Sequence, residues 1–260
     1  MTDLRTTTSR DGTRLAYDVH GSGPALVYVT GATCFRRFWP IVQDSKAFAK
    51  AFTVYTYDRR GRGDSDDGLP WSVEREVDDI EAVIDAAGGT ASVYGHSSGA
   101  VLALEASLRL PHKIAKTVLY DAAYVHDAAE KADYERLAQQ VRELLAGGDD
   151  TAALKTFLRG IGMPGAFTAL LPLVPGWRTM KALAPTIAYD LALTRDLPPL
   201  AKAQSVTVPT QVIVGQKSPP GLHVVARQLA GAIPHAELVE LAGQGHLVSA
   251  RRLLPVLCES

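Results

Sequence analysis

Short runs of apolar residues alternate along the chain with stretches of helical periodicity. Six runs are apolar on both faces, at residues 25–30, 53–57, 91–94, 114–120, 210–214 and 236–241. Such runs are typical of the strands of a buried parallel sheet. Helical periodicity occurs at residues 39–51, 72–87, 98–110, 222–230 and 247–257. The alternation predicts a doubly wound α/β sheet with right-handed crossovers, preceded by a hairpin over residues 6–18 that turns at Asp11-Gly12.

Residues 122–206 interrupt this alternation. They read as an amphipathic helix over 128–145 and then become rich in Pro and Gly, with no strand pattern. A helical segment inserted between two strands usually covers the sheet edge where ligands bind, at the strand C-termini. We therefore expect a core formed by residues 1–121 and 207–260, and a helical cap or lid over 122–206. The alternative is that the segment is only a packing elaboration.

Composition excludes several classes of protein. The 260 residues include 27 Lys+Arg and 28 Asp+Glu, a net charge of −1, and 47% are hydrophobic. These values do not fit a disordered chain, and there is no basic excess for binding nucleic acid. No run of about 18 apolar residues could span a membrane, and the polar first nine residues do not resemble a signal peptide. We expect a cytoplasmic protein that acts on a small molecule, with neither a membrane nor a nucleic acid as partner.

Cysteine and histidine spacing gives no metal motif. The two cysteines, Cys34 and Cys258, belong to no C-x-x-C pair, and no H-E-x-x-H occurs. We expect no disulfide framework, no metal and no cofactor.

The segment Gly95-His96-Ser97-Ser98-Gly99 fits the pattern G-x-S-x-G. It follows one predicted strand and opens a predicted helix. A sharp strand-to-helix turn would lift Ser97 above the sheet edge, and the helix N-terminus would supply partial positive charge. The pattern predicts Ser97 as a nucleophile, with His96 packed beside the turn. The alternative is a Gly- and Ser-rich connection without chemistry.

His246 follows the last predicted strand, in a glycine-rich loop from which it could reach Ser97. Histidine side chains in general have a near-neutral pKa, which suits a general base. The alternative is an ordinary loop histidine.

The loop 215–220, where an acid would be expected, holds no carboxylate. Asp121, at the end of the 114–120 strand, could fix the His246 tautomer instead, and we favour this role over the alternative, a cap of the following helix. Weaker candidates lie in the inserted segment: Asp127, Asp190 and Asp196.

The loop Thr30-Gly31-Ala32-Thr33 ends an early buried strand. In this architecture such a loop supplies an oxyanion donor, so we assign the oxyanion hole to the N–H groups of Ala32 and Ser98. We expect Thr33, Cys34 and Phe35 to line the pocket floor, and we favour Ser97 over Cys34 as the nucleophile.

Residues 58–65 (DRRGRGDS) are rich in charge and glycine. They match neither the P-loop pattern nor G-x-G-x-x-G, so a phosphate cradle is the weaker interpretation. We expect a buttressing loop with internal Asp–Arg pairs.

Residues 57–65, the Gly95–Gly99 segment and Gly245-His246 together resemble the α/β-hydrolase superfamily, across essentially the whole chain. The resemblance implies an eight-stranded, mostly parallel sheet flanked by helices, with a cap inserted after strand six. It also implies Ser97 as nucleophile, His246 as base, and Asp121 as the acid of those members, haloalkane dehalogenases among them, that place it after strand six. One departure is Thr30-Gly31, where His-Gly is frequent and its histidine often braces the loop.

Ser97 separates this chain from dehalogenases and epoxide hydrolases of the same fold, which use an Asp nucleophile, and points to acyl chemistry. We expect a cofactor-independent serine hydrolase that cleaves an ester, lactone or thioester of a small-to-medium apolar molecule through an acyl-enzyme. A non-hydrolytic enzyme (C–C lyase, cyclase or cofactor-free perhydrolase) and a binding protein with a residual triad are the alternatives. Side chains from the insertion would form the pocket walls, unless they only pack the insertion: Phe157, Met163, Phe167, Leu171 and Trp177.

Overall fold

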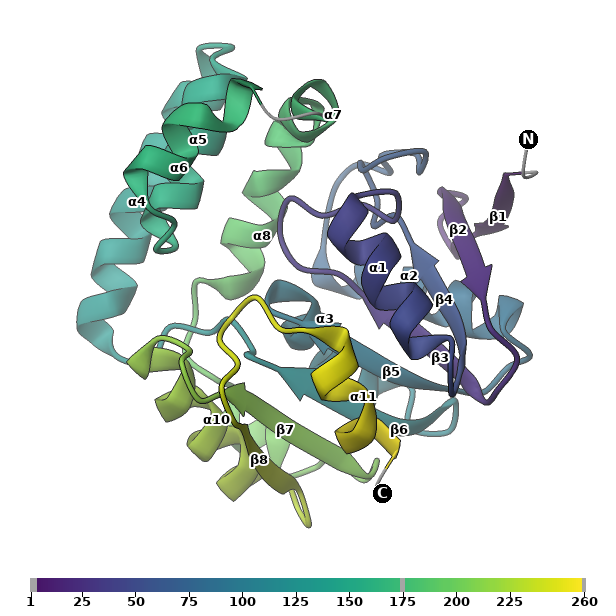
Figure 1. The fold of residues 1–260 in the computed structure, drawn as a ribbon. Helices are drawn as coiled ribbons and strands as arrows, with labels where there is room; N and C mark the ends of the chain where they lie inside the picture. The colour runs from purple at the N-terminus through teal and green to yellow at the C-terminus, as the bar shows by residue number, and fades with distance from the viewer. Residues whose placement is uncertain (1–3, 174–175, 259–260) are drawn as a thin grey trace.

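The computed structural model describes residues 4–173 and 176–258. Its centre is an eight-stranded sheet in the order β1-β2-β4-β3-β5-β6-β7-β8 (Figure 1). Strands β1 and β2 form the predicted antiparallel hairpin, β2 pairs antiparallel with β4, and the remaining pairs are parallel. The strands are β1 (Arg5–Thr8), β2 (Arg14–His20), β3 (Ala25–Val29), β4 (Thr53–Tyr57), β5 (Ala91–His96), β6 (Ile114–Tyr120), β7 (Thr210–Gly215) and β8 (Glu237–Leu241).

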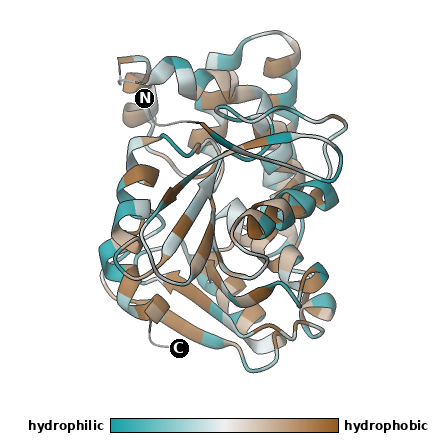
Figure 2. Cartoon of the chain, turned by 90° about the vertical axis from the view of Figure 1, so that its right-hand side faces the viewer, coloured by the Kyte–Doolittle hydropathy of each residue, from teal (hydrophilic) through white to brown (hydrophobic). Residues whose placement is uncertain are grey.

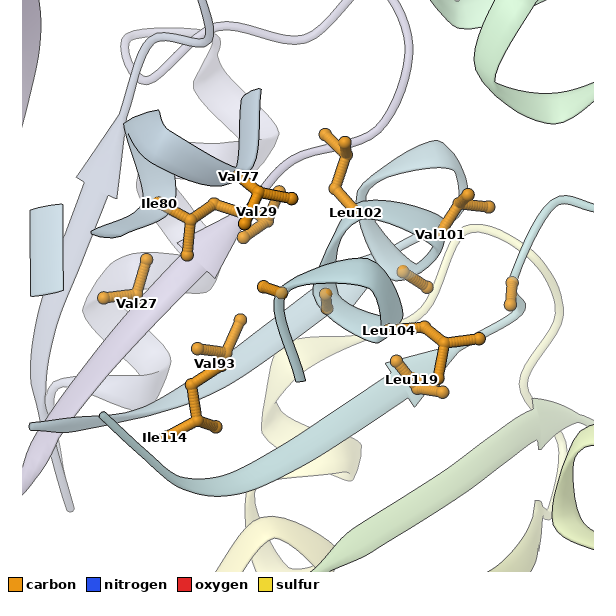
Figure 3. Close-up of a cluster of buried hydrophobic side chains, with 14 of the residues drawn as sticks. Val27, Val29, Val77, Ile80, Val93, Val101, Leu102, Leu104, Ile114 and Leu119 are labelled. Carbon is orange, nitrogen blue, oxygen red and sulfur yellow. The ribbon is translucent and has the colours of Figure 1, made fainter. Parts of the chain in front are cut away.

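Helices cover both faces of this sheet because alternate strand residues point to opposite sides. Val27 and Val29 of β3 join an apolar cluster under α2 (Val73–Ala86), α3 (Ser98–Arg109) and α10 (Pro220–Ala232), part of which is shown in Figure 3. Leu26 and Tyr28 join a second cluster under α1 (Trp39–Phe48) and α11 (Ala250–Cys258). Figure 2 shows brown, apolar segments in the sheet and teal, polar residues on many of the surrounding helices. The fold class predicted from the apolar runs is confirmed.

Six α-helices and two 3₁₀ turns lie between β6 and β7 in the described residues: α4 (Ala128–Ala146), α5 (Asp150–Gly160), α6 (Gly165–Leu170), η1 (Leu171–Leu173), α7 (Trp177–Ala182), η2 (Ala184–Thr186), α8 (Ile187–Thr194) and α9 (Leu200–Ala203). We call them the α4–α9 segment. Its helices α4, α5 and α6 stand away from the sheet, and α8 runs back toward the core (Figure 1). The segment contains an apolar cluster of its own.

The side chains of Asp127 and Asp149 cap α4 and α5 by accepting N–H groups of the first turn. The C-terminal helix begins at Ala250, later than its periodicity suggested, because the preceding residues form the loop that carries His246. Among the described residues, no helix has the length and apolar character needed to cross a bilayer.

Candidate active site

Ser97 lies at a strained turn between β5 and α3. Its backbone has φ 58° and ψ −122°, a region that non-glycine residues seldom adopt. The flanking glycines are required by close packing. A Cβ at Gly95 would lie 2.3 Å from the carbonyl oxygen of Gly99, and one at Gly99 would lie 2.2 Å from that of Val29. The structure therefore has the predicted sharp strand–turn–helix at this motif.

His246 and Asp121 are brought together from segments far apart in the sequence. The Nδ1 atom of His246 lies 3.0 Å from Oδ2 of Asp121. Asp121 is buried, and it also accepts hydrogen bonds from the N–H of Gly215 (3.1 Å) and the hydroxyl of Ser218 (2.6 Å). These two donors orient the Asp121 carboxylate. Nδ1 of His246 therefore faces an acceptor in a fixed position, and its Nε2 is left for a substrate or nucleophile.

The weaker aspartate candidates have other partners. Asp127 caps α4, and Asp196 pairs with Lys131 at 2.6 Å. Asp190 is buried against two arginines, described below.

His96 anchors the His246 loop to the turn. Its Nε2 lies 2.8 Å from the carbonyl oxygen of His246, and the two rings have centroids 4.9 Å apart. A carbonyl only accepts, so this nitrogen carries the hydrogen. Burial, and then the neighbouring His246, lower the pKa of His96 to about 4, which keeps it neutral near pH 7. Tyr120 holds the same loop through a 2.7 Å hydrogen bond to the carbonyl of Gly245. His96 thus packs beside the turn, as predicted.

The loop after β3 lies against Ser97. A Cβ at Gly31 would lie 3.1 Å from Cβ of Ser97, which is tighter than an ordinary contact, so the loop passes close to Ser97. Within the described part of the chain, neither the Ala32 nor the Ser98 N–H donates to a protein acceptor. Ser98 is also the first residue of the 12-residue helix α3. Two free N–H groups beside a nucleophile are what binding of an oxyanion requires.

A buried charge cluster beside this site was missed by sequence reasoning. We call it the Asp190 cluster: Arg59, Arg62, Glu76 and Asp190, each at most 1% exposed at the side chain. Arg59 pairs with Glu76 of α2 at 2.5 Å and with Asp190 of α8 at 2.9 Å, and Arg62 pairs with Asp190 at 2.6 Å.

The expectation of internal Asp–Arg pairs in residues 58–65 is wrong for these residues. The arginines instead reach carboxylates on α2 and α8, and Asp58 pairs with Arg36. The arginine side chains extend to the surrounding helices, whereas the Asp58 carboxylate also accepts the N–H of Asp64 within the loop. Its arginine-rich composition was the available signal for buried partners.

The expected pocket residues fall into two groups. Phe157 and Leu171 are buried in the apolar cluster of the α4–α9 segment, and Met163 and Trp177 pack against it. Ala32 packs against the same cluster, which places that cluster next to the loop after β3. Phe167 is 47% exposed.

The three residues expected on the pocket floor pack in different surroundings. Thr33 is buried with φ 57°, Cys34 packs toward the cluster under α1 and α11, and the ring of Phe35 lies 5.9 Å from that of Phe38. Burial raises the pKa of the Cys34 thiol to about 11, so this thiol is protonated near pH 7 and is a poor nucleophile. Among the described residues, no group of three or more His, Cys, Asp or Glu could hold a metal ion.

Comparison with known proteins finds a family model that matches most of the chain. The model of the alpha/beta hydrolase family matches residues 19–253. A solved structure of an alpha/beta hydrolase from Sphaerobacter thermophilus is 38% identical, with a TM-score of 0.88, and the match covers 98% of this chain and 99% of that one. The enol-lactonase from Burkholderia xenovorans is 20% identical over 98% of this chain and 100% of its own, with a TM-score of 0.75.

A curated relative, the polyketide synthase ThaQ of Burkholderia thailandensis, is 29% identical over 237 residues. That match covers 88% of this chain and only 11% of ThaQ.

Proposed function

Because the chain belongs to the alpha/beta hydrolase family, we propose that it is a serine hydrolase that cleaves an ester, lactone or thioester of a small-to-medium apolar molecule. The observation that carries the proposal is the 3.0 Å contact between buried Asp121 and His246, beside the strained turn at Ser97. A nucleophile, a base and a group that orients the base are the parts that acyl transfer needs.

In the proposed reaction, Ser97 Oγ attacks the substrate carbonyl carbon and its proton passes to Nε2 of His246. Asp121 keeps the other ring nitrogen protonated and stabilises the imidazolium that forms. The negative oxygen of the tetrahedral intermediate accepts hydrogen bonds from the N–H groups of Ala32 and Ser98. His246 then protonates the leaving alcohol or thiol. Water, activated by the same histidine, hydrolyses the acyl-enzyme and restores Ser97.

The apolar character of the substrate is proposed from the surroundings of the oxyanion loop. Ala32 packs against the apolar cluster of the α4–α9 segment, at whose edge lie Met163 and Trp177. A substrate carbonyl held at Ala32 would therefore have apolar side chains close to its acyl or alcohol part. We propose that residues 122–206 form a lid and that this cluster lines its inner side.

The direct test is covalent labelling of Ser97 by a fluorophosphonate, followed by intact mass measurement. Wild type should gain one adduct, because only an activated serine reacts at an appreciable rate. Ser97→Ala should gain none, and Ser205→Ala, which changes an exposed serine, should label like wild type.

An unlabelled wild type that is folded would contradict an activated nucleophile and favour a binding protein. If labelling succeeds, turnover in ¹⁸O-water tests hydrolysis itself. The acid product must contain solvent oxygen, and its absence would favour a non-hydrolytic reaction.

A further inference from the structure

Both residues of the proposed oxyanion hole are attached to the Asp190 cluster. The carboxylate of Asp190 is hydrogen-bonded to the side chain of Ser98 and, through Arg62, to the residue before Ala32. Oδ1 of Asp190 accepts from the hydroxyl of Ser98 at 2.8 Å, and Oδ2 accepts from Nη2 of Arg62 at 2.6 Å. Arg62 in turn donates from Nη1 to the carbonyl oxygen of Gly31 at 2.8 Å. A single side chain of α8 therefore contacts the turn at Ser97-Ser98 directly, and the loop after β3 through one arginine.

The contact at Gly31 bears on Ala32 through the peptide bond between them. The carbonyl of Gly31 and the N–H of Ala32 are the two ends of one planar unit and point in opposite directions. When Arg62 fixes the carbonyl, it also fixes the direction of the N–H. A charged donor on the carbonyl further polarises the peptide, which makes its N–H a stronger donor.

The contact at Ser98 acts on the second donor. Its hydroxyl donates to Asp190 and accepts from Nη1 of Arg59 at 3.3 Å. The side chain is therefore held from both sides, and the backbone N–H of the same residue is fixed at the first position of α3. No contact to substrate is needed for this effect, because it works through the donor's own side chain.

The cluster is ionised and electrically balanced. Two arginines face two carboxylates, those of Glu76 and Asp190. Burial alone would raise the pKa of Asp190, but Arg62 and Arg59 hold it below its usual value. Buried ion pairs seldom add net stability compared with apolar packing. Stability alone is therefore a weak reason for placing four charges here.

We propose that Arg62 and Asp190 are positioning residues that orient the Ala32 and Ser98 N–H groups toward the oxyanion, which makes helix α8 a structural part of the hole. The inference rests on the proposed function. The proposal also gives the loop a brace at Thr30-Gly31, a position where a histidine often braces the loop in relatives. Here Thr30 Oγ1 is buried without a partner in the part of the chain described, and the brace comes from Arg62.

The test compares the same substitution at two buried arginines two positions apart. Arg62→Lys keeps the charge but loses the planar fork that reaches Gly31 and Asp190 together. Arg60→Lys is the matched control, because Arg60 is equally buried and binds Asp79 through two bonds of 2.8 and 2.6 Å. Within the described residues, its side chain makes no hydrogen bond to Gly31, Ala32 or Ser98.

For Arg62→Lys we expect kcat on an activated ester to fall about 10- to 100-fold with KM within about 3-fold, since removing one oxyanion donor entirely costs about 10²–10³. Affinity for a trifluoromethyl ketone, which forms a tetrahedral oxyanion on Ser97, should fall by the same factor as kcat/KM. Arg60→Lys should change each value by less than about 3-fold.

The positioning role and the proposed function are contradicted by different results. If Arg62→Lys matches Arg60→Lys, or if its loss only follows the folded fraction, the positioning role is wrong. If wild type takes up no fluorophosphonate and cleaves no ester, the proposed function fails and this inference fails with it.

Should Arg62→Lys not fold, the double variant Arg62→Met/Asp190→Asn decides. It removes one charge of each sign and leaves Arg59 paired with Glu76. A folded double variant with wild-type kcat would overturn the proposal, and one with the expected loss would support it.

Discussion

Asp121 shows how much one residue of the candidate site could be predicted. The absence of a carboxylate from loop 215–220 pointed to the end of β6, and the structure places Asp121 there at 3.0 Å from His246. That same loop contributes Ser218, which donates to Asp121 at 2.6 Å. Sequence could place Asp121 near His246 because a strand end fixes position. It could not show Ser218 as its partner, because that contact depends on the loop's conformation.

Replacing Asp121 by Asn should lower kcat by about 10³–10⁴-fold while the protein stays folded. The amide nitrogen of Asn can donate to Nδ1 of His246, which favours the tautomer whose Nε2 carries the hydrogen and cannot accept the Ser97 proton. Steady-state kinetics on an activated ester measure the loss, and circular dichroism checks the fold.

Asp196→Asn is the control for this prediction, because Asp196 is 58% exposed at the side chain and pairs with Lys131. Its kcat should stay near that of wild type. If Asp121→Asn also kept wild-type kcat, the acid of the site would have to be another residue.

At the scale of elements, the least predictable one is α8. The pattern of residues 122–206 indicated helices between two strands, and the α4–α9 segment contains them. Nothing in that pattern tied Asp190 to Arg62 or Ser98, which lie 128 and 92 positions away. Helical periodicity indicates which face of a helix is buried. It does not indicate which charged side chain from another element lies against that face. An Asp inside the apolar helix α8 was a second signal, beside the arginine-rich composition of residues 58–65.

Helix α7 offers a prediction about substrate size. Trp177, its first residue, packs at the edge of the apolar cluster that also contacts Ala32. Trp177→Ala should raise KM for a medium-chain ester by about 10-fold, because burying a large side chain against substrate contributes about 1.5–3 kcal/mol. Kinetics on a minimal acetyl ester provide the control within the same variant, and its KM should change little. Equal losses on both esters would indicate damage to the segment's packing instead.

For the whole molecule, alternation of apolar runs with helical periodicity was sufficient to predict the sheet and its flanking helices. A strand that is apolar on both faces must have layers on both sides, and β3 does, with Val27 facing one cluster and Leu26 the other. The buried charges follow a different logic. They belong to the residues 58–65 loop, and their partners lie on α2, on α8 and in the loop before α1, which only the complete fold brings near. Apolar burial can therefore be predicted from the local sequence pattern, whereas the partners of buried charges cannot.

The two helices on the α1 face supply a prediction about global stability and pH. Asp44 of α1 accepts a 3.3 Å hydrogen bond from the hydroxyl of Tyr28, and its carboxylate lies near the backbone of Ala250 at the start of α11. Burial nevertheless raises the pKa of Asp44 from 3.8 to about 6. The folded state then binds a proton more tightly than the unfolded state. This group therefore lowers stability as pH rises from about 4 to 6, and the full cost is present above pH 6.

Asp44→Asn removes that ionisation and keeps a side-chain oxygen that can accept from Tyr28. We expect the variant to be more stable than wild type by about 1–2 kcal/mol at pH 7.5, and the gain to vanish below about pH 4, where the wild-type carboxyl is protonated in both states. Urea unfolding between pH 4 and 8 measures the difference. Asp66→Asn, at an exposed aspartate paired with Arg14, is the control, and its difference from wild type should not grow over this range. A gain for Asp44→Asn that was the same at every pH would mean that packing, and not the buried charge, sets the stability of this helix pair.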